Sequence, residues 1–232
     1  MRQPAAIRLQ TSGALESSRA VYRDRIDAAE RLAEALAARG VAPGGRPLVL
    51  GIPRGGVVLA RIVADRLGGD LDVVVPHKIG APWNAELAIG AVASDGPAVI
   101  DDRIVRMLRV SPRYIDDEIA RQRDEIRRRL LAYRGDAQPV DPAGRDCIVV
   151  DDGMATGATA EAAVLELRAR GASRVIMAAP VASDAACARL RRVADDVVCP
   201  LVPEEFVAVG QWFERFDQVS DASVIAELAA RA

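Results

Sequence analysis

The stretch Cys147-Ile-Val-Val-Asp-Asp-Gly-Met-Ala-Thr-Gly-Ala-Thr159 decides the fold of this chain. Its four apolar residues predict a buried strand, and two carboxylates stand where that strand ends. A short loop with glycines and threonines follows, and residues 158–170 then predict a helix that ends at Gly171. A strand, a loop and a helix in this order are typical of a parallel α/β sheet, which binds ligands at the carboxyl ends of its strands.

The regions on both sides of this stretch continue the alternation of strands and helices. The spacing of Tyr22, Ile26 and Ala29 predicts an amphipathic helix over residues 22–39, with Gly40 as its end. The sheet is predicted to be doubly wound and mainly parallel, with about five strands flanked by helices. We expect its other strands at 47–52, 71–76, 175–180 and 197–201, and further helices at 57–67 and 183–194.

The middle of the chain interrupts this alternation. The segment from Gly80 to Gly96 contains a proline and glycines, and it predicts a long loop or a hairpin. The apolar spacing over Ser111–Arg134 predicts a charged helix. Residues 101–136 hold ten arginines and eight acids, a surplus of two positive charges. This near balance favours a solvated helix, with pairs such as Asp117/Arg121, or a contact in a homodimer over a nucleic-acid surface.

The composition is that of an ordinary globular protein. The chain has 232 residues, 50% of them hydrophobic, and a formal net charge of −2, so we expect a single domain. The isoelectric point near 5.6 argues against a general nucleic-acid binder. No apolar run reaches the roughly 20 residues of a membrane span, and the first residues lack the hydrophobic region of a signal peptide. We therefore expect a cytoplasmic protein that binds neither nucleic acid nor membrane.

Several common ligand-binding and catalytic motifs are absent. The chain has no Walker A loop, no GxGxxG after a predicted strand and no GxSxG, which disfavours P-loop, dinucleotide-binding and nucleophile-elbow proteins. Three cysteines without CxxC spacing and the single histidine, His77, argue against disulfide frameworks and against zinc or histidine-rich metal sites. Lys78 is the only lysine among 31 basic residues. It is either a compositional accident or a position that needs a compact charge.

The stretch that decides the fold also suits a ligand with both anionic and hydroxyl groups. Backbone N–H groups at the predicted helix start, with the helix dipole behind them, favour a phosphate monoester. Thr156 and Thr159 add hydroxyl donors to that phosphate site. Asp151 and Asp152 stand just before the loop, where carboxylates can accept hydrogen bonds from the vicinal hydroxyls of a ribose.

This stretch resembles the phosphoribosyl-pyrophosphate signature of the type I phosphoribosyltransferases, which has four apolar residues, two acids and a small loop that ends in T-G-x-T. The resemblance implies that Asp151 and Asp152 hold the ribose hydroxyls. It also implies that the loop wraps the 5′-phosphate through Gly153, Met154, Ala155, Thr156, Gly157, Ala158 and Thr159.

A second segment, Gly51-Ile-Pro-Arg-Gly-Gly56, follows the first predicted strand, where the family has its pyrophosphate loop. Taken alone, this segment would suit an ordinary glycine turn equally well. The resemblance implies that the backbone amides of Arg54, Gly55 and Gly56 face the diphosphate, with Arg54 and Lys78 as catalytic residues. Lys78 stands where several members carry a basic residue that meets pyrophosphate, and residues 79–95 match the family's mobile flap in position.

The C-terminal segment Val202-Pro-Glu-Glu-Phe-Val-Ala-Val-Gly-Gln-Trp-Phe213 resembles the hood of the 6-oxopurine branch of the family. The resemblance implies that Phe206 stacks on the base, with Trp212 as a second candidate. Phe213 and Phe216 suit the core of the hood equally well.

Two departures from that branch leave the acceptor base open. Ala155 stands where the branch has an aspartate near the purine, and no lysine follows Lys78 to meet an exocyclic oxygen. Within the single domain we expect a core at residues 22–100 and 146–201 and a hood with the C-terminal segment at 202–232. The resemblance covers about residues 22–96 and 147–217. The helical insertion at 101–140 lies outside it.

The resemblance implies a phosphoribosyltransferase, that is, a pentosyltransferase that joins a nitrogenous base to phosphoribosyl pyrophosphate and releases pyrophosphate. Mg²⁺ would be held mainly by the substrate, with no direct protein ligand. An alternative is a regulatory protein that binds phosphoribosyl pyrophosphate or a nucleotide without turnover, because fold does not fix function. A phosphohydrolase with Asp151 as nucleophile ranks lower, because the Asp-x-Asp spacing is missing.

Overall fold

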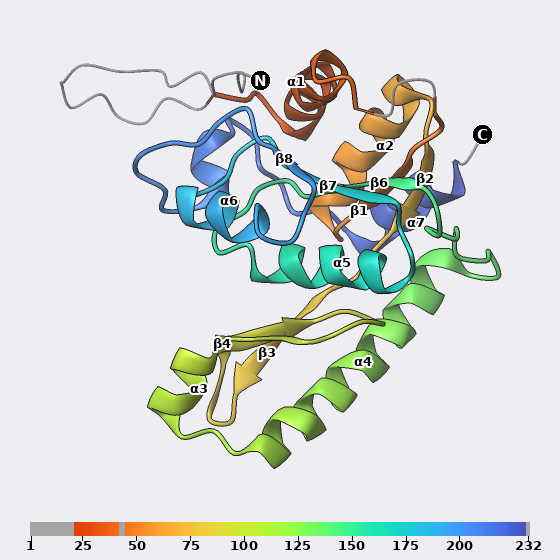
Figure 1. The fold of residues 1–232 in the computed structure, drawn as a ribbon. Coiled ribbons are helices and arrows are strands. Elements are labelled where there is room, and N and C mark those ends of the chain that lie inside the picture. Colours follow the sequence, from red (N-terminus) through yellow and green to blue (C-terminus); the bar gives the residue numbers. More distant parts are fainter. Residues whose placement is uncertain (1–20, 42–44, 231–232) are drawn as a thin grey trace.

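The computed structural model describes residues 21–41 and 45–230 of the chain. At its centre lies a five-stranded parallel sheet with the order β2-β1-β6-β7-β8, which confirms the predicted fold class (Figure 1). The strands are β1 (Leu48–Gly51), β2 (Asp70–Val73), β6 (Asp146–Val150), β7 (Arg174–Ala178) and β8 (Asp196–Val198). The helices next to them are α1 (Arg25–Ala38), α2 (Gly55–Leu67), α5 (Ala158–Ala169), α6 (Asp184–Leu190) and α7 (Asp221–Ala229).

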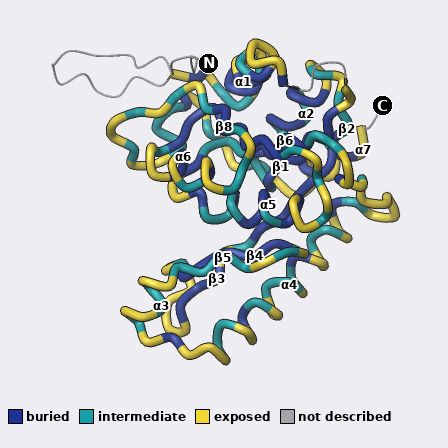
Figure 2. Tube along the Cα trace, in the orientation of Figure 1, coloured by how far each residue is buried: buried dark blue, intermediate teal, exposed yellow. Residues whose placement is uncertain are grey.

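Helices cover both faces of the sheet, with α1 and α2 on one face and α5 and α6 on the other (Figure 1). The side chains of β1 alternate between the two apolar layers: Val49 packs in the cluster of α1 and α2, whereas Leu50 packs in that of α5 and α6. Both residues are at most 1% exposed. Because the strands are buried on both faces, as Figure 2 shows, their sequences are continuous apolar runs rather than alternating ones.

A second, antiparallel sheet and two helices form a lobe beside the main sheet (Figure 1). The predicted loop or hairpin between Gly80 and Gly96 is a hairpin, and its first strand already begins at His77. The predicted helix at 111–134 is confirmed, with Ser111 as its N-cap. The elements of the lobe are β3 (His77–Ala81), β4 (Asn84–Val92), β5 (Val99–Ile100), α3 (Asp102–Leu108) and α4 (Pro112–Arg134).

A buried ion pair ties the end of α4 to the main sheet. The guanidinium of Arg134 donates to both carboxylate oxygens of Asp72 in β2, at 3.0 and 3.2 Å. Asp72 is 1% exposed and also accepts a hydrogen bond from the Val140 N–H. The long helix is therefore anchored at its C-terminal end next to the core.

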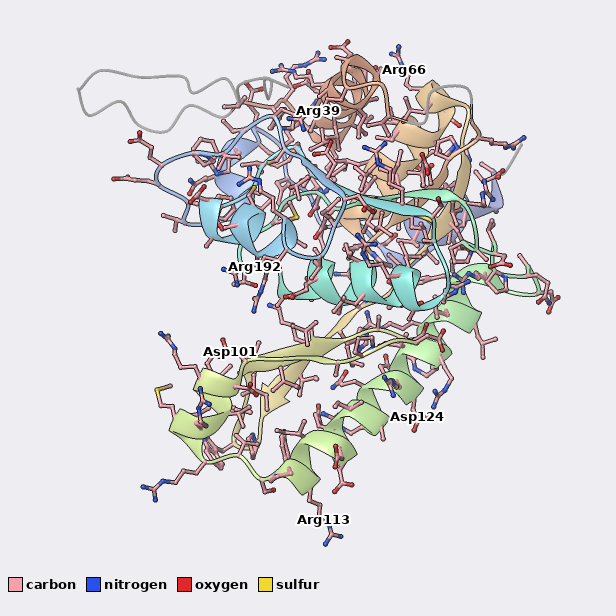
Figure 3. The ribbon with its side chains drawn as sticks, in the orientation of Figure 1. Arg39, Arg66, Asp101, Arg113, Asp124 and Arg192 are labelled. Atoms are coloured by element: carbon pink, nitrogen blue, oxygen red, sulfur yellow. The ribbon has the colours of Figure 1, made fainter. Side chains whose placement is uncertain are left out.

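The remainder of α4 carries a solvated charged surface. Figure 3 shows Arg113 and Asp124 projecting from the helix away from the main sheet. The expected pair Asp117/Arg121 is wrong: Arg121 instead forms a bidentate pair with Glu118, three residues before it, at 2.6 and 2.8 Å. Glu118 is only 6% exposed. Because a buried charge is costly unless it is paired, Arg121 stabilises Glu118 more than it would stabilise the exposed Asp117.

The first helix begins later than the apolar pattern predicts. The carboxylate of Asp24 accepts hydrogen bonds from the N–H groups of Ile26 and Asp27, which fixes the start of α1 at Arg25. Tyr22 therefore precedes the helix and forms an isolated bridge with Phe213. Ile26, expected on the apolar face, is 57% exposed.

Between β8 and α7 the chain is irregular apart from one short 3₁₀ helix, η1 (Val209–Trp212). No helix in residues 21–41 and 45–230 is long and apolar enough to cross a membrane.

Candidate functional site

The two loops predicted to bind phosphates lie side by side at one edge of the sheet. They follow the adjacent parallel strands β1 and β6, in which Gly51 is aligned with Val150. A methyl group on Gly56 would lie 2.5 Å from the Val150 carbonyl oxygen and 3.0 Å from the Cα of Asp151. Glycine at position 56 therefore permits the close approach of one loop to the other.

The helices that follow these two loops differ from the other α-helices in how they begin. An Asp or Ser side chain caps the first turn of α1, α3, α4, α6 and α7. The N-cap positions of α2 and α5 are Arg54 and Gly157, and neither makes a side-chain capping bond. Free N–H groups and the helix dipole thus favour an anion at both neighbouring N-termini.

The loop between β6 and α5 is held from behind by the segment that leads into α6. The Met154 N–H donates to the Val181 carbonyl at 3.0 Å, and the Ser183 hydroxyl donates to the Ala155 carbonyl at 2.6 Å. Gly157 has φ +72°, and a side chain there would press on Ala186 of α6 at 3.3 Å. The carbonyl oxygens of Met154, Ala155 and Thr156 thus accept hydrogen bonds from Ser183 and Arg189, while the residues Ala155 and Thr156 remain exposed.

The two acids after β6 line a cavity of about 400 Å³. Asp151 is positioned by its own N–H, which donates to the Ala178 carbonyl, and by its Oδ1, which accepts from the Asp152 N–H at 2.9 Å. Burial, and secondly the charge of Asp152, holds the pKa of Asp151 well above its ordinary value. Burial also raises the pKa of Asp152, against the opposing effect of Arg25. Two desolvated carboxyls favour a ligand that brings hydroxyl donors.

The structure adds residues to the cavity that sequence reasoning missed. Arg25, the first residue of α1, forms an ion pair with Asp152 at 2.9 Å, and its guanidinium carbon lies 3.8 Å from the centre of the Phe216 ring. Val209 of η1 covers Gly153 so closely that a methyl group on this glycine would lie 2.8 Å from Val209 Cγ2. The residues that line the cavity are Arg25, Pro53, Arg54, Gly55, Asp151, Asp152, Val209, Phe216, Asp217, Gln218 and Val219.

The aromatic residues of the hood lie partly at this cavity and partly in a small apolar cluster. Phe216, and not Phe206 or Trp212, is among the residues that line this cavity. Phe206 and Trp212 pack against the small apolar cluster that contains Tyr22 and Phe213. Their role as partners of a base stays a prediction.

The two predicted catalytic cations occupy different places. Arg54 lines the cavity, and its Nη1 lies 3.9 Å from Asp221 of α7. Lys78 is exposed in β3 opposite Ala91, and a cross-strand pair in an antiparallel sheet shares one face. Ala91 packs in a cluster with Ala158 at the start of α5. Lys78 therefore lies on the face of the small sheet that is directed to α5, outside the lining of the cavity.

The capacity of the cavity to hold a metal depends on its carboxylates. Within the described ranges, no group of three or more His, Cys, Asp or Glu side chains is arranged to hold a metal ion. The carboxylates of Asp151 and Asp152 are oxygen donors of the kind that Mg²⁺ accepts. Such a pair of acids suits a metal that is held mainly by the substrate and by water beside it.

A family model that matches most of the chain shows its family. Residues 19–215 match the model of the phosphoribosyl transferase domain. The chain is 42% identical over 208 residues, 90% of its length, to a provisionally named phosphoribosyl transferase of Mycobacterium tuberculosis, of which the match covers 46%. It is 30% identical over 189 residues to the ribose-phosphate pyrophosphokinase of Shewanella oneidensis, covering 75% of this chain and 56% of that protein. The chain thus spans about half the length of these curated relatives.

Among solved structures, the fold is similar to that of the protein TT1426 from Thermus thermophilus. The TM-score is 0.77 at 46% sequence identity, and the match covers 91% of this chain and 99% of TT1426.

Proposed function

The chain belongs to the phosphoribosyltransferase family, and on this premise we propose that it transfers the 5-phosphoribosyl group of phosphoribosyl pyrophosphate to a nitrogenous base. One observation carries the proposal. The helices α2 and α5 follow adjacent strands, begin without side-chain caps and lie next to a pair of desolvated carboxyls, those of Asp151 and Asp152. Phosphoribosyl pyrophosphate has an anionic group at each end of a ribose, which is the distribution of charge and hydroxyls that such a site complements.

Each part of the site then has one task. The N–H groups at the start of α5, with the hydroxyls of Thr156 and Thr159, hold the 5′-phosphate. Asp151 and Asp152 accept hydrogen bonds from the ribose hydroxyls. The backbone N–H groups of residues 54–56, at the start of α2, hold the diphosphate. Mg²⁺, when bound with the substrate, would offset the charge of the diphosphate beside the acid pair.

The reaction breaks the bond between the anomeric carbon and the diphosphate oxygen, and that oxygen leaves with the electron pair. A nitrogen of the base supplies the electron pair of the new bond and loses its proton to solvent. Positive charge develops on the ribose and negative charge on the leaving group, so fixed donors at the N-terminus of α2 lower the barrier. The protein contributes mainly by holding the reactants in line and excluding water under the hood.

The test is a screen of purines, pyrimidines and orotate with phosphoribosyl pyrophosphate and Mg²⁺, followed by pyrophosphate release. We expect release with one class of base. The double variant Asp151→Asn/Asp152→Asn should lower kcat/KM by roughly ten-fold or more, since hydrogen bonds to charged groups contribute about 1.5–3 kcal/mol each.

The matched control is Asp116→Asn/Asp117→Asn, the adjacent acid pair on the exposed side of α4. It should leave the rate unchanged. Binding of phosphoribosyl pyrophosphate without pyrophosphate release from any base would favour the regulatory alternative, and absence of binding would refute the proposal.

A further inference from the structure

We propose that Arg25 binds the diphosphate of phosphoribosyl pyrophosphate, and that its guanidinium exchanges Asp152 for this group when the substrate enters. The inference rests on the proposed function, and it assigns a role to a residue that lies before the core sheet and outside both family motifs.

The guanidinium of Arg25 is held in one place by three neighbours. Its Nε donates to Asp152 Oδ2 at 2.9 Å, and its Nη1 donates to the Asp217 carbonyl at 2.6 Å. Its central carbon, Cζ, lies 3.8 Å from the centre of the Phe216 ring. The side chain is only 13% exposed, yet it lines the cavity. A planar cation fixed in this way is preorganised for a ligand oxygen.

The same guanidinium lies against the loop that we assign to the diphosphate. A methyl group on Gly55 would overlap the Asp152 carboxylate and would lie 2.9 Å from Arg25 Nε. Glycine at position 55 therefore leaves the guanidinium next to the first residue of α2. The N-terminus of α2 and Arg25 thus present positive charge to the same small region of the cavity.

Arg25 retains donor capacity in this arrangement. Its Nη2 has no hydrogen-bond partner among residues 21–41 and 45–230, whereas Nε and Nη1 are engaged. Asp152 would accept a ribose hydroxyl when the substrate binds, which releases Arg25 Nε for a diphosphate oxygen. The ion pair of the ligand-free protein is thereby replaced by two new interactions, and no buried charge is left without a partner.

Arg25 is also the best-fixed cation of the cavity. Arg54, which the sequence motif favours, has a 39% exposed side chain and only a 3.9 Å contact with Asp221. A mobile exposed arginine loses more side-chain entropy when it binds a ligand than one that is already fixed. The diphosphate should therefore depend on Arg25 more than on the Arg54 side chain.

The experiment compares two ligands that differ only in the diphosphate. Phosphoribosyl pyrophosphate and ribose 5-phosphate share the 5′-phosphate and the ribose hydroxyls. Isothermal titration, in the presence of Mg²⁺, gives their affinities for the wild type, Arg25→Ala and Arg25→Lys. The control is Arg31→Ala, which removes an arginine of the same helix that pairs with Asp27 at 3.0 Å and does not line the cavity.

We expect Arg25→Ala to lower the affinity for phosphoribosyl pyrophosphate at least about ten-fold and the affinity for ribose 5-phosphate less than two-fold. Arg25→Lys should lower the affinity for phosphoribosyl pyrophosphate by an intermediate factor, because lysine keeps the charge but lacks the planar guanidinium. If Arg25→Ala does not fold, the lysine variant carries the same comparison. Arg31→Ala should change neither affinity.

Two results would overturn the inference alone. If Arg25→Ala lowers the affinity for both ligands equally, Arg25 acts only by holding Asp152 in place. If the affinity for phosphoribosyl pyrophosphate is unchanged, Arg25 has no role in binding it. A wild-type protein that does not bind phosphoribosyl pyrophosphate at all would overturn the inference and the proposed function together.

Discussion

Replacing Asp151 by Asn should stabilise the ligand-free protein and weaken substrate binding at the same time. The Asn side chain keeps the Oδ1 acceptor for the Asp152 N–H, so the turn after β6 is preserved. Burial and the charge of Asp152 raise the pKa of Asp151 in the folded protein, which means that folding disfavours its carboxylate. Asn removes that cost and also removes the charged acceptor that a ribose hydroxyl needs.

The sign of the pH dependence follows from the raised pKa of Asp151. Below the ordinary value of 3.8, the carboxyl is protonated in both the folded and the unfolded chain, and wild type and variant should be equally stable. As the pH rises from 3.8 through the folded-state pKa, the wild type loses stability relative to the variant, and above that pKa the difference is constant. Because each unit of a pKa shift corresponds to about 1.4 kcal/mol, the variant should be measurably more stable than the wild type near pH 7.

Chemical denaturation of the ligand-free proteins between pH 3.5 and 8 measures this difference, and calorimetric titration measures the affinity for phosphoribosyl pyrophosphate. The affinity should fall roughly ten-fold or more. Asp116→Asn, on the exposed side of α4, serves as the control and should change neither quantity. A variant that is less stable than the wild type at neutral pH, or a difference that does not vary with pH, would refute the reasoning.

Three further substitutions test separate parts of the structure. Arg134→Ala removes a bidentate ion pair to the buried Asp72 and should lower the free energy of unfolding by about 3 kcal/mol, measured by urea denaturation. A loss below about 1 kcal/mol would contradict the anchoring of α4. Gly153→Ala should push Val209 away and weaken phosphoribosyl pyrophosphate binding, and the added change Val209→Ala should restore part of the affinity. No restoration would mean that contact between Val209 and the loop does not affect binding. Lys78→Ala should lower kcat more than it raises KM for phosphoribosyl pyrophosphate, with partial rescue by Arg, and a wild-type kcat would reject a catalytic role.

The central sheet and the loops at its edge could be predicted because their physical signals are local. A run such as Cys147–Val150 is apolar at every position because both of its faces are buried, and the adjacent acids and glycines mark the end of the strand. Glycine is required at Gly56 because the two loops approach each other closely there, and at Gly157 because its φ is positive. The parallel order then places the two loops together.

The remainder of the site depends on contacts across the chain that no local pattern records. Arg25 lies 127 residues from Asp152, and nothing in its surroundings distinguishes it from the other 29 arginines. Phe216 lines the cavity with its ring beside Arg25 and 4.7 Å from that of Phe213, whereas Phe206 packs in the apolar cluster of the hood. The Asp24 cap shifts the start of α1 past Tyr22, so that Arg25, which lines the cavity, is the first residue of the helix.

The most direct test of the proposed binding mode is a crystal structure of the protein with phosphoribosyl pyrophosphate and Mg²⁺. We expect the 5′-phosphate at the N-terminus of α5, with N–H groups of residues 156–159 about 3 Å from its oxygens. We also expect the diphosphate at residues 54–56 and the ribose hydroxyls on Asp151 and Asp152. A substrate bound in the opposite direction, or bound away from these two helix N-termini, would contradict this binding mode.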